Sequence, residues 1–122
     1  MTPRPLSITI VGWLFVLMGG GGIATQLIQL LNLINASAPL DARESRDLAI
    51  VLTLRLMALI GGVFLLRGSN WARWMLVVWM AYHIQISLAH SWLEAAMHAA
   101  IFGVLVYLLF RRGASAYFRQ AA

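Results

Sequence analysis

The sequence predicts an all-α integral membrane protein, and three observations support that fold class. First, 61% of its 122 residues are hydrophobic and only 11% are charged, a composition far from that of a soluble domain. Second, the apolar residues form four runs, each long enough for a helix that crosses about 30 Å of hydrocarbon. Third, most of the arginines fall on one side of the membrane that these runs define: Arg4, Arg67, Arg73, Arg111, Arg112 and Arg119. Because cationic loops resist translocation, we expect a four-helix bundle, up-down-up-down, with both termini in the cytoplasm.

The expected elements follow from where each apolar run begins and ends. The connection after the first run carries charges of both signs, including Arg43 and Arg46, and is expected on the outer side. Ser91 and Glu94 have the spacing of a capping box at the start of the fourth run. We expect one membrane domain, 1–122, with a tail in the inner headgroup zone. The spans and the tail are predicted at about 6–34, 48–66, 71–89, 92–110 and 111–122.

Small residues predict where the helices pack closely. Four consecutive glycines, 19–22, lie within the first span, and a small side chain lets another helix approach closely in lipid. Spacings of four residues place small side chains on one face of the first span and one face of the second. The residues expected at helix contacts are therefore Gly20, Ala24, Ala58 and Gly62.

Polar residues inside the spans are the exceptions that indicate a site, since each is costly in hydrocarbon unless it is paired. With the predicted topology, the polar residues of all four spans lie in the outer half of the bilayer. They predict a polar cluster facing into the bundle and open to the outer side. Its expected members are Arg55, His83, Glu94 and His98, with Gln26 and Gln29 at the rim.

Each member of this cluster also has a simpler interpretation. Arg55 could extend its guanidinium to the outer headgroups or form a structural ion pair. Glu94 is already explained as a capping residue. His83 and His98 could simply form hydrogen bonds across the hairpin of the third and fourth spans, and glutamines commonly join helices in lipid.

No complete catalytic set is present in the sequence. His90, Glu94 and His98 have the i, i+4, i+8 spacing of three zinc ligands, but such a spacing arises readily by chance in a polar end region. Cysteine is absent, which removes thiolate chemistry and disulfides. His83 and His98 lie on neighbouring helices of a tight hairpin, which leaves little room for a porphyrin between them. The basic residues are scattered around the apolar runs and form no single patch for nucleic acid. We therefore expect no enzyme activity, no cofactor, no metal and no nucleic-acid partner.

Several short sequences at the membrane boundaries resemble a recurrent pattern. They are Arg-Pro-Leu-Ser-Ile-Thr-Ile at 4–10, Leu-Arg-Gly at 66–68, Trp-Ala-Arg at 71–73 and the aromatic pair at 117–118. In these the chain resembles small uncharacterised four-helix inner-membrane proteins of bacteria. The resemblance implies a bacterial inner membrane and a four-span fold, and it implies no activity.

Three functions are compatible with the sequence. The glycine-rich faces and the missing catalytic set favour a non-catalytic interaction protein or accessory subunit, which self-associates or packs on a larger membrane complex. Its partners would be the lipid bilayer and a second copy or another membrane protein. The outer polar cluster alternatively indicates a small transporter or channel protomer. The histidines alternatively indicate a redox protein that binds quinone or haem.

Overall fold

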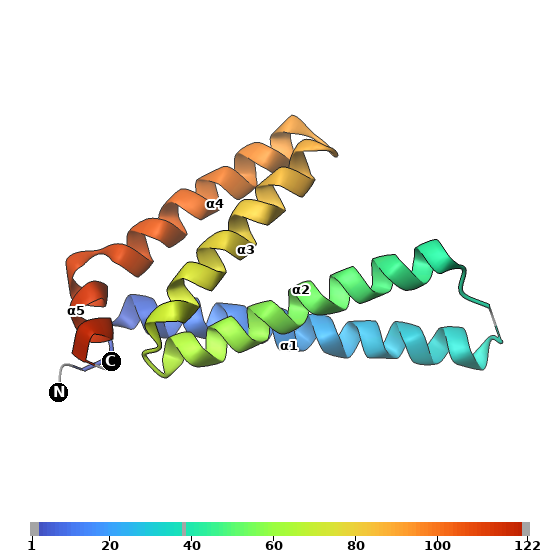
Figure 1. The fold of residues 1–122 in the computed structure, drawn as a ribbon, viewed down its shortest axis with the longest axis horizontal. Coiled ribbons are helices and arrows are strands. Elements are labelled where there is room, and N and C mark those ends of the chain that lie inside the picture. The colour runs from blue at the N-terminus through green and yellow to red at the C-terminus, as the bar shows by residue number, and fades with distance from the viewer. Residues whose placement is uncertain (1–2, 38, 121–122) are drawn as a thin grey trace.

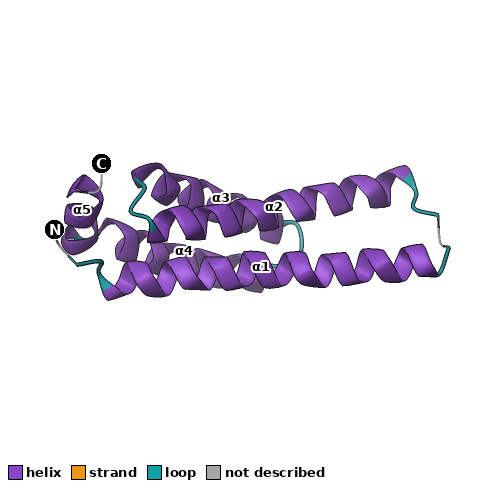
Figure 2. Cartoon of the chain, turned by 90° about the horizontal axis from the view of Figure 1, so that it is seen from below, coloured by secondary structure: helices purple, strands orange, loops and turns teal. Residues whose placement is uncertain are grey.

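The computed structural model describes residues 3–37 and 39–120, and over these residues it contains helices and their connections only (Figure 2). The predicted all-α class is therefore confirmed. In chain order the helices are α1 (Leu6–Asn35), α2 (Ala42–Leu66), α3 (Asn70–Leu88), α4 (Trp92–Phe110) and α5 (Arg112–Gln120).

Side-chain caps determine where α2 and α4 begin. At α2, Asp41 Oδ1 accepts a hydrogen bond from the Glu44 N–H at 2.7 Å, and Glu44 Oε2 accepts one from the Asp41 N–H at 3.0 Å. This capping box starts α2 at Ala42, before the apolar run expected from residue 48. At α4, Ser91 Oγ accepts from the Glu94 N–H at 3.1 Å. The reciprocal bond predicted there is replaced, because the Ser91 N–H donates to the Ser87 carbonyl at 3.0 Å.

Three of the helices, α1, α2 and α4, are long and apolar enough to cross a membrane, as expected of an integral membrane protein. Helix α3 has the length of α4 but is less apolar, since it carries Arg73, His83 and Gln85 among its residues. Many large apolar side chains are exposed, such as Leu17 and Val104, which suits helices surrounded by lipid.

The helices form two antiparallel hairpins that diverge from each other. Figure 1 shows α1 beside α2 and α3 beside α4, with the two pairs meeting at the end where both termini and α5 lie. We call this the closed end, and the opposite end, where the pairs are apart, the open end. The turn between the pairs depends on Gly68, whose φ of 80° lies in the left-handed region that favours glycine.

Glycines bring the backbones of α1 and α2 into contact. A Cβ added to Gly19 would lie 2.5 Å from the Leu59 nitrogen, and one added to Gly62 would lie 2.8 Å from the Gly12 carbonyl oxygen. No side chain larger than hydrogen fits at either position without separating the helices. The interface between α1 and α2 is therefore held at two levels by glycine.

Of the four residues expected at helix contacts, two lie in or near this interface and two lie away from it. Gly62 lies in it, and Ala58 is buried. Gly20 lies at its side, where an added Cβ would make an ordinary 3.9 Å contact with Leu59, and Ala24 is exposed. The face of α1 that contacts α2 contains Gly12 and Gly19, which are two helical turns apart. Gly20 and Ala24 therefore lie beside this face and not on it.

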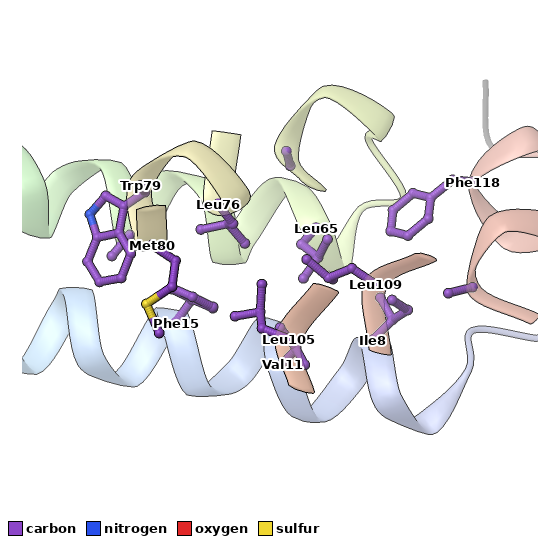
Figure 3. Close-up of a cluster of buried hydrophobic side chains, with 13 residues drawn as sticks. Ile8, Val11, Phe15, Leu65, Leu76, Trp79, Met80, Leu105, Leu109 and Phe118 are labelled. Carbon is purple, nitrogen blue, oxygen red and sulfur yellow. The ribbon is translucent and has the colours of Figure 1, made fainter. Parts of the chain in front are cut away.

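The apolar core fills the closed end. Its most buried side chains come from all five helices, as Figure 3 shows: Ile8, Phe15, Leu65, Leu76, Leu109 and Phe118. Helix α5 turns back onto this core, and the Tyr117 hydroxyl donates to the Leu66 carbonyl at 3.4 Å. At the closed end, buried apolar side chains therefore pack the two hairpins together.

Candidate functional site

Arg55 lies in the interior of α2, and its guanidinium is bound to α1. Nη1 donates to the Gly22 carbonyl, and to Gln26 Oε1 at 2.6 Å. A longer contact of 3.5 Å joins the same nitrogen to Thr25 Oγ1. The guanidinium is therefore bound by uncharged groups of α1 and is not paired with Glu94, the acidic member of the predicted cluster.

Gly22 makes room for this arrangement. A Cβ added to Gly22 would lie 2.9 Å from Arg55 Cδ and 3.0 Å from Arg55 Nε, whereas a Cβ added to Gly21 would meet nothing within 4 Å. The aliphatic part of Arg55 thus lies across the bare face of Gly22. This glycine fixes the path of the side chain between the two helices.

No carboxylate neutralises Arg55. Within residues 3–37 and 39–120, the single ion pair joins Arg46 to Asp47, at 3.7 Å and on the surface. The oxygens that bind Arg55 belong to a carbonyl, an amide and a hydroxyl, all uncharged. The hydrogen-bond partners of Arg55 are therefore all uncharged.

Two histidines lie opposite, on α3 and α4. His83 Nδ1 is 3.0 Å from the Trp79 carbonyl and His98 Nδ1 is 2.8 Å from the Glu94 carbonyl. Because a carbonyl oxygen only accepts, Nδ1 donates the proton in both contacts, and Nε2 of a ring in its neutral form is then an acceptor. Ser87 Oγ is 3.0 Å from His98 Nδ1 and donates to the His83 carbonyl at 2.8 Å, which joins the two histidines across the hairpin.

Trp79 fixes the position of His83 and connects it to α2. Its indole ring stacks on the imidazole with ring centres 3.8 Å apart. Its Nε1 donates to the Leu54 carbonyl at 2.8 Å, next to Arg55 in the chain. Trp79 therefore links His83 to the backbone of α2 next to Arg55 through one hydrogen bond between the hairpins.

A cavity of about 530 Å³ brings Arg55, His83 and His98 together. It lies between the two hairpins, beyond the apolar core. The three residues are 11, 12 or 13 positions from the closed ends of their helices, or about 16–20 Å along each helix. Because the three residues lie at a similar distance from the closed end, they line the same cavity. The remaining wall is mostly apolar: Leu14, Phe15, Met18, Ala58, Ile101 and Leu105.

The structure separates the other expected cluster members from this cavity. Gln26 is buried and reaches Arg55 from the side of α1. Gln29 is exposed and lines a second hollow of about 470 Å³ between α1 and α2, which Gln26 and Arg55 also line, together with Glu44 and Asp47. Glu94 is exposed at the start of α4, where its backbone takes part in the cap.

The described part of the chain offers no group of three His, Asp or Glu side chains that could hold a metal ion. The two histidines of the cavity are thus the largest set of metal-ligand type there, and the third contributor is a cation. Structural zinc needs four ligands, and catalytic zinc needs three. The chemistry of the cavity is that of hydrogen bonding and charge.

Sequence reasoning did not find two residues of this site. Trp79 lies one helical turn before His83, and the i, i+4 spacing of an aromatic residue and a histidine was the available signal. Gly22 lies one turn before Gln26, and its role depends on the path of Arg55 from another helix, which no local pattern encodes.

The chain was also compared with known proteins: it matches no family model, no curated protein and no solved structure.

Proposed function

We propose that this chain is a non-catalytic, multi-pass protein of the bacterial inner membrane, with both termini cytoplasmic, that binds a lipid-soluble ligand between its hairpins. The observation that carries the proposal is the shared cavity of Arg55, His83 and His98. A cavity of about 530 Å³ with apolar walls and a few converging polar groups is the usual form of a small-molecule site. Polar groups at this depth in lipid are a sign of function, because they are costly to keep there.

Binding fits the arrangement better than transport. A transport route would continue from the cavity to the closed end. That end is filled by buried apolar side chains, including Phe15, Leu76 and Leu109. A ligand that enters the cavity therefore has no polar path onward, and the arrangement favours retention of the ligand.

Substitution of one wall residue tests the proposal. Ile101 lines the cavity, whereas Val104 lies on the same helix, is exposed and is not part of the wall. We expect Ile101→Trp to fill the cavity and to reduce the amount of amphiphile that solvent extraction and mass spectrometry recover from the purified protein. Val104→Trp should leave that amount unchanged. Equal recovery from both variants would overturn the proposal.

A second candidate function is the interaction protein that the sequence favours. The glycines at 12, 19 and 62 are used inside the chain, so the support for this function moves to the divergence of the hairpins (Figure 1). A transmembrane segment of a second copy would pack between the hairpins where they diverge. Native mass spectrometry in mild detergent tests this. A protein that remains monomeric at every concentration measured would contradict it.

A further inference from the structure

We infer that the ligand of the cavity is an anionic amphiphile, an alkyl chain with a carboxylate or phosphate head, and that Arg55 binds the head. This inference rests on the proposed function and names the chemical class of the ligand. Three features of the cavity lead to it: a cation that forms no ion pair, two histidines in the same cavity, and an apolar wall that continues to exposed side chains.

The charge of Arg55 is the first feature. Its hydrogen bonds to Gly22 and Gln26 use Nη1 and uncharged oxygens. Among the residues described, Nε and Nη2 donate to no other group, and they form one edge of a planar fork. That edge matches the two oxygens of a carboxylate or phosphate. An anion there would neutralise the charge that the protein leaves uncompensated in hydrocarbon.

The histidines supply the second feature. With Nδ1 of each ring bound to a backbone carbonyl, Nε2 is the free acceptor of His83 and of His98. These atoms can accept a hydrogen bond from the O–H of a protonated acid or from a headgroup hydroxyl. They carry no negative charge, so they do not compete with a ligand for Arg55.

The wall supplies the third feature. Phe15 and Leu105 form its buried part, while Leu14, Met18 and Ile101 are each about half exposed. The apolar surface is therefore continuous from the cavity to the outer faces of α1 and α4. An alkyl tail can lie along it while the head stays beside Arg55, so a ligand can enter sideways from the bilayer.

The decisive variant places a carboxylate inside the protein. Gln26 Oε1 is 2.6 Å from Arg55 Nη1, so Gln26→Glu supplies a counter-charge of almost the same shape. We expect palmitate to bind the Gln26→Glu protein at least about tenfold more weakly than the wild type, since a charged hydrogen bond is lost. Gln85→Glu, at an exposed position of α3 that lines neither hollow, is the matched control and should bind palmitate like the wild type.

A second pair of variants moves Arg55 without changing its charge. Gly22→Ala forces the arginine stem aside, whereas Gly21→Ala meets nothing. We expect weaker palmitate binding only for Gly22→Ala. Both substitutions suit a helix, so loss of folding does not complicate the comparison.

The probes are palmitate, hexadecanol, and nanodiscs of phosphatidylglycerol or phosphatidylcholine. Palmitate should bind the wild type about tenfold or more tightly than hexadecanol, because only the acid pairs with Arg55. Tighter binding of palmitate than of hexadecanol or either phospholipid identifies a free fatty acid as the ligand. Tighter binding of phosphatidylglycerol than of phosphatidylcholine or palmitate identifies an anionic phospholipid. Equal binding of palmitate and hexadecanol, or unchanged binding in Gln26→Glu, overturns the inference. If Ile101→Trp still removes the bound amphiphile in that case, the proposed function stands without it.

Discussion

The guanidinium carbon of Arg73 lies 4.6 Å from the centre of the Phe118 ring, and this contact joins α3 to α5. The ring of Phe110 lies 4.7 Å from the same carbon, so two aromatic rings contact one cation. Nη1 also donates to the Leu109 carbonyl at 3.3 Å, at the end of α4. Arg73, predicted as one of the charges that orient the chain, is therefore also a structural link among three helices.

Removal of this guanidinium should release α5. We expect Arg73→Leu to lower the free energy of unfolding in detergent by about 1–3 kcal/mol, because cation–π contacts and a charged hydrogen bond are lost. Hydrogen exchange over residues 112–120 should accelerate. Arg119→Ala, at an exposed position on the same helix, is the control and should change neither quantity. Unaltered exchange in Arg73→Leu would show that α5 is held by its apolar contacts alone.

The two neighbouring glycines of α1 should respond differently to alanine. At Gly19 a Cβ would meet the backbone of Leu59 and Arg55, and backbone does not move aside. We expect Gly19→Ala to destabilise the protein by about 1–3 kcal/mol in SDS unfolding from mild detergent. Gly20→Ala makes only an ordinary contact and should be neutral or slightly stabilising. Equal effects at the two positions would contradict the packing of α1 on α2.

The cap of α2 can be tested by a local measurement. Asp41→Ala removes the acceptor of the Glu44 N–H, and we expect a loss of about 1 kcal/mol. Hydrogen exchange of the first turn of α2 should accelerate severalfold while α4 is unchanged. Arg43→Ala, also exposed in that turn, should leave the exchange as it is. A first turn that keeps its protection without Asp41 would show that the cap is dispensable.

The predicted orientation can be read directly, because the chain has no cysteine of its own. The Ala36→Cys variant places the thiol in the connection that follows α1 in the chain, and Arg119→Cys places it on α5. Because cationic ends stay inside, we expect a membrane-impermeant maleimide to label only Ala36→Cys in spheroplasts and to label both after lysis. The opposite pattern would reverse the topology.

Much of the helical framework is encoded locally and could be predicted. Apolar runs, the Ser91 cap and the break at Gly68 indicate helices without reference to distant residues. The Asp41–Glu44 cap was equally readable, since its D-x-x-E spacing precedes the apolar run. The meeting of Arg55 with the two histidines also follows from counting, because all three lie at one level.

The divergence of the hairpins could not be predicted from the sequence. In lipid both the packed and the lipid-facing sides of a helix are apolar, so periodicity does not show which side meets another helix. For the same reason Gln26 and Gln29 are equivalent in the sequence, yet one is buried against Arg55 and the other is exposed. Only the position of α2 distinguishes them.

The two hairpins also differ in reach. Helices α3 and α4 have 19 residues each, about 28 Å, while α1 has 30 residues, about 45 Å. If both pairs cross a membrane, a hydrocarbon layer of about 30 Å would match the length of the shorter pair, and the longer pair would tilt or extend its outer turns beyond the layer. The charged first turns of α2 favour the second outcome. The outer turns of α1 and α2 would then project beyond the lipid into water.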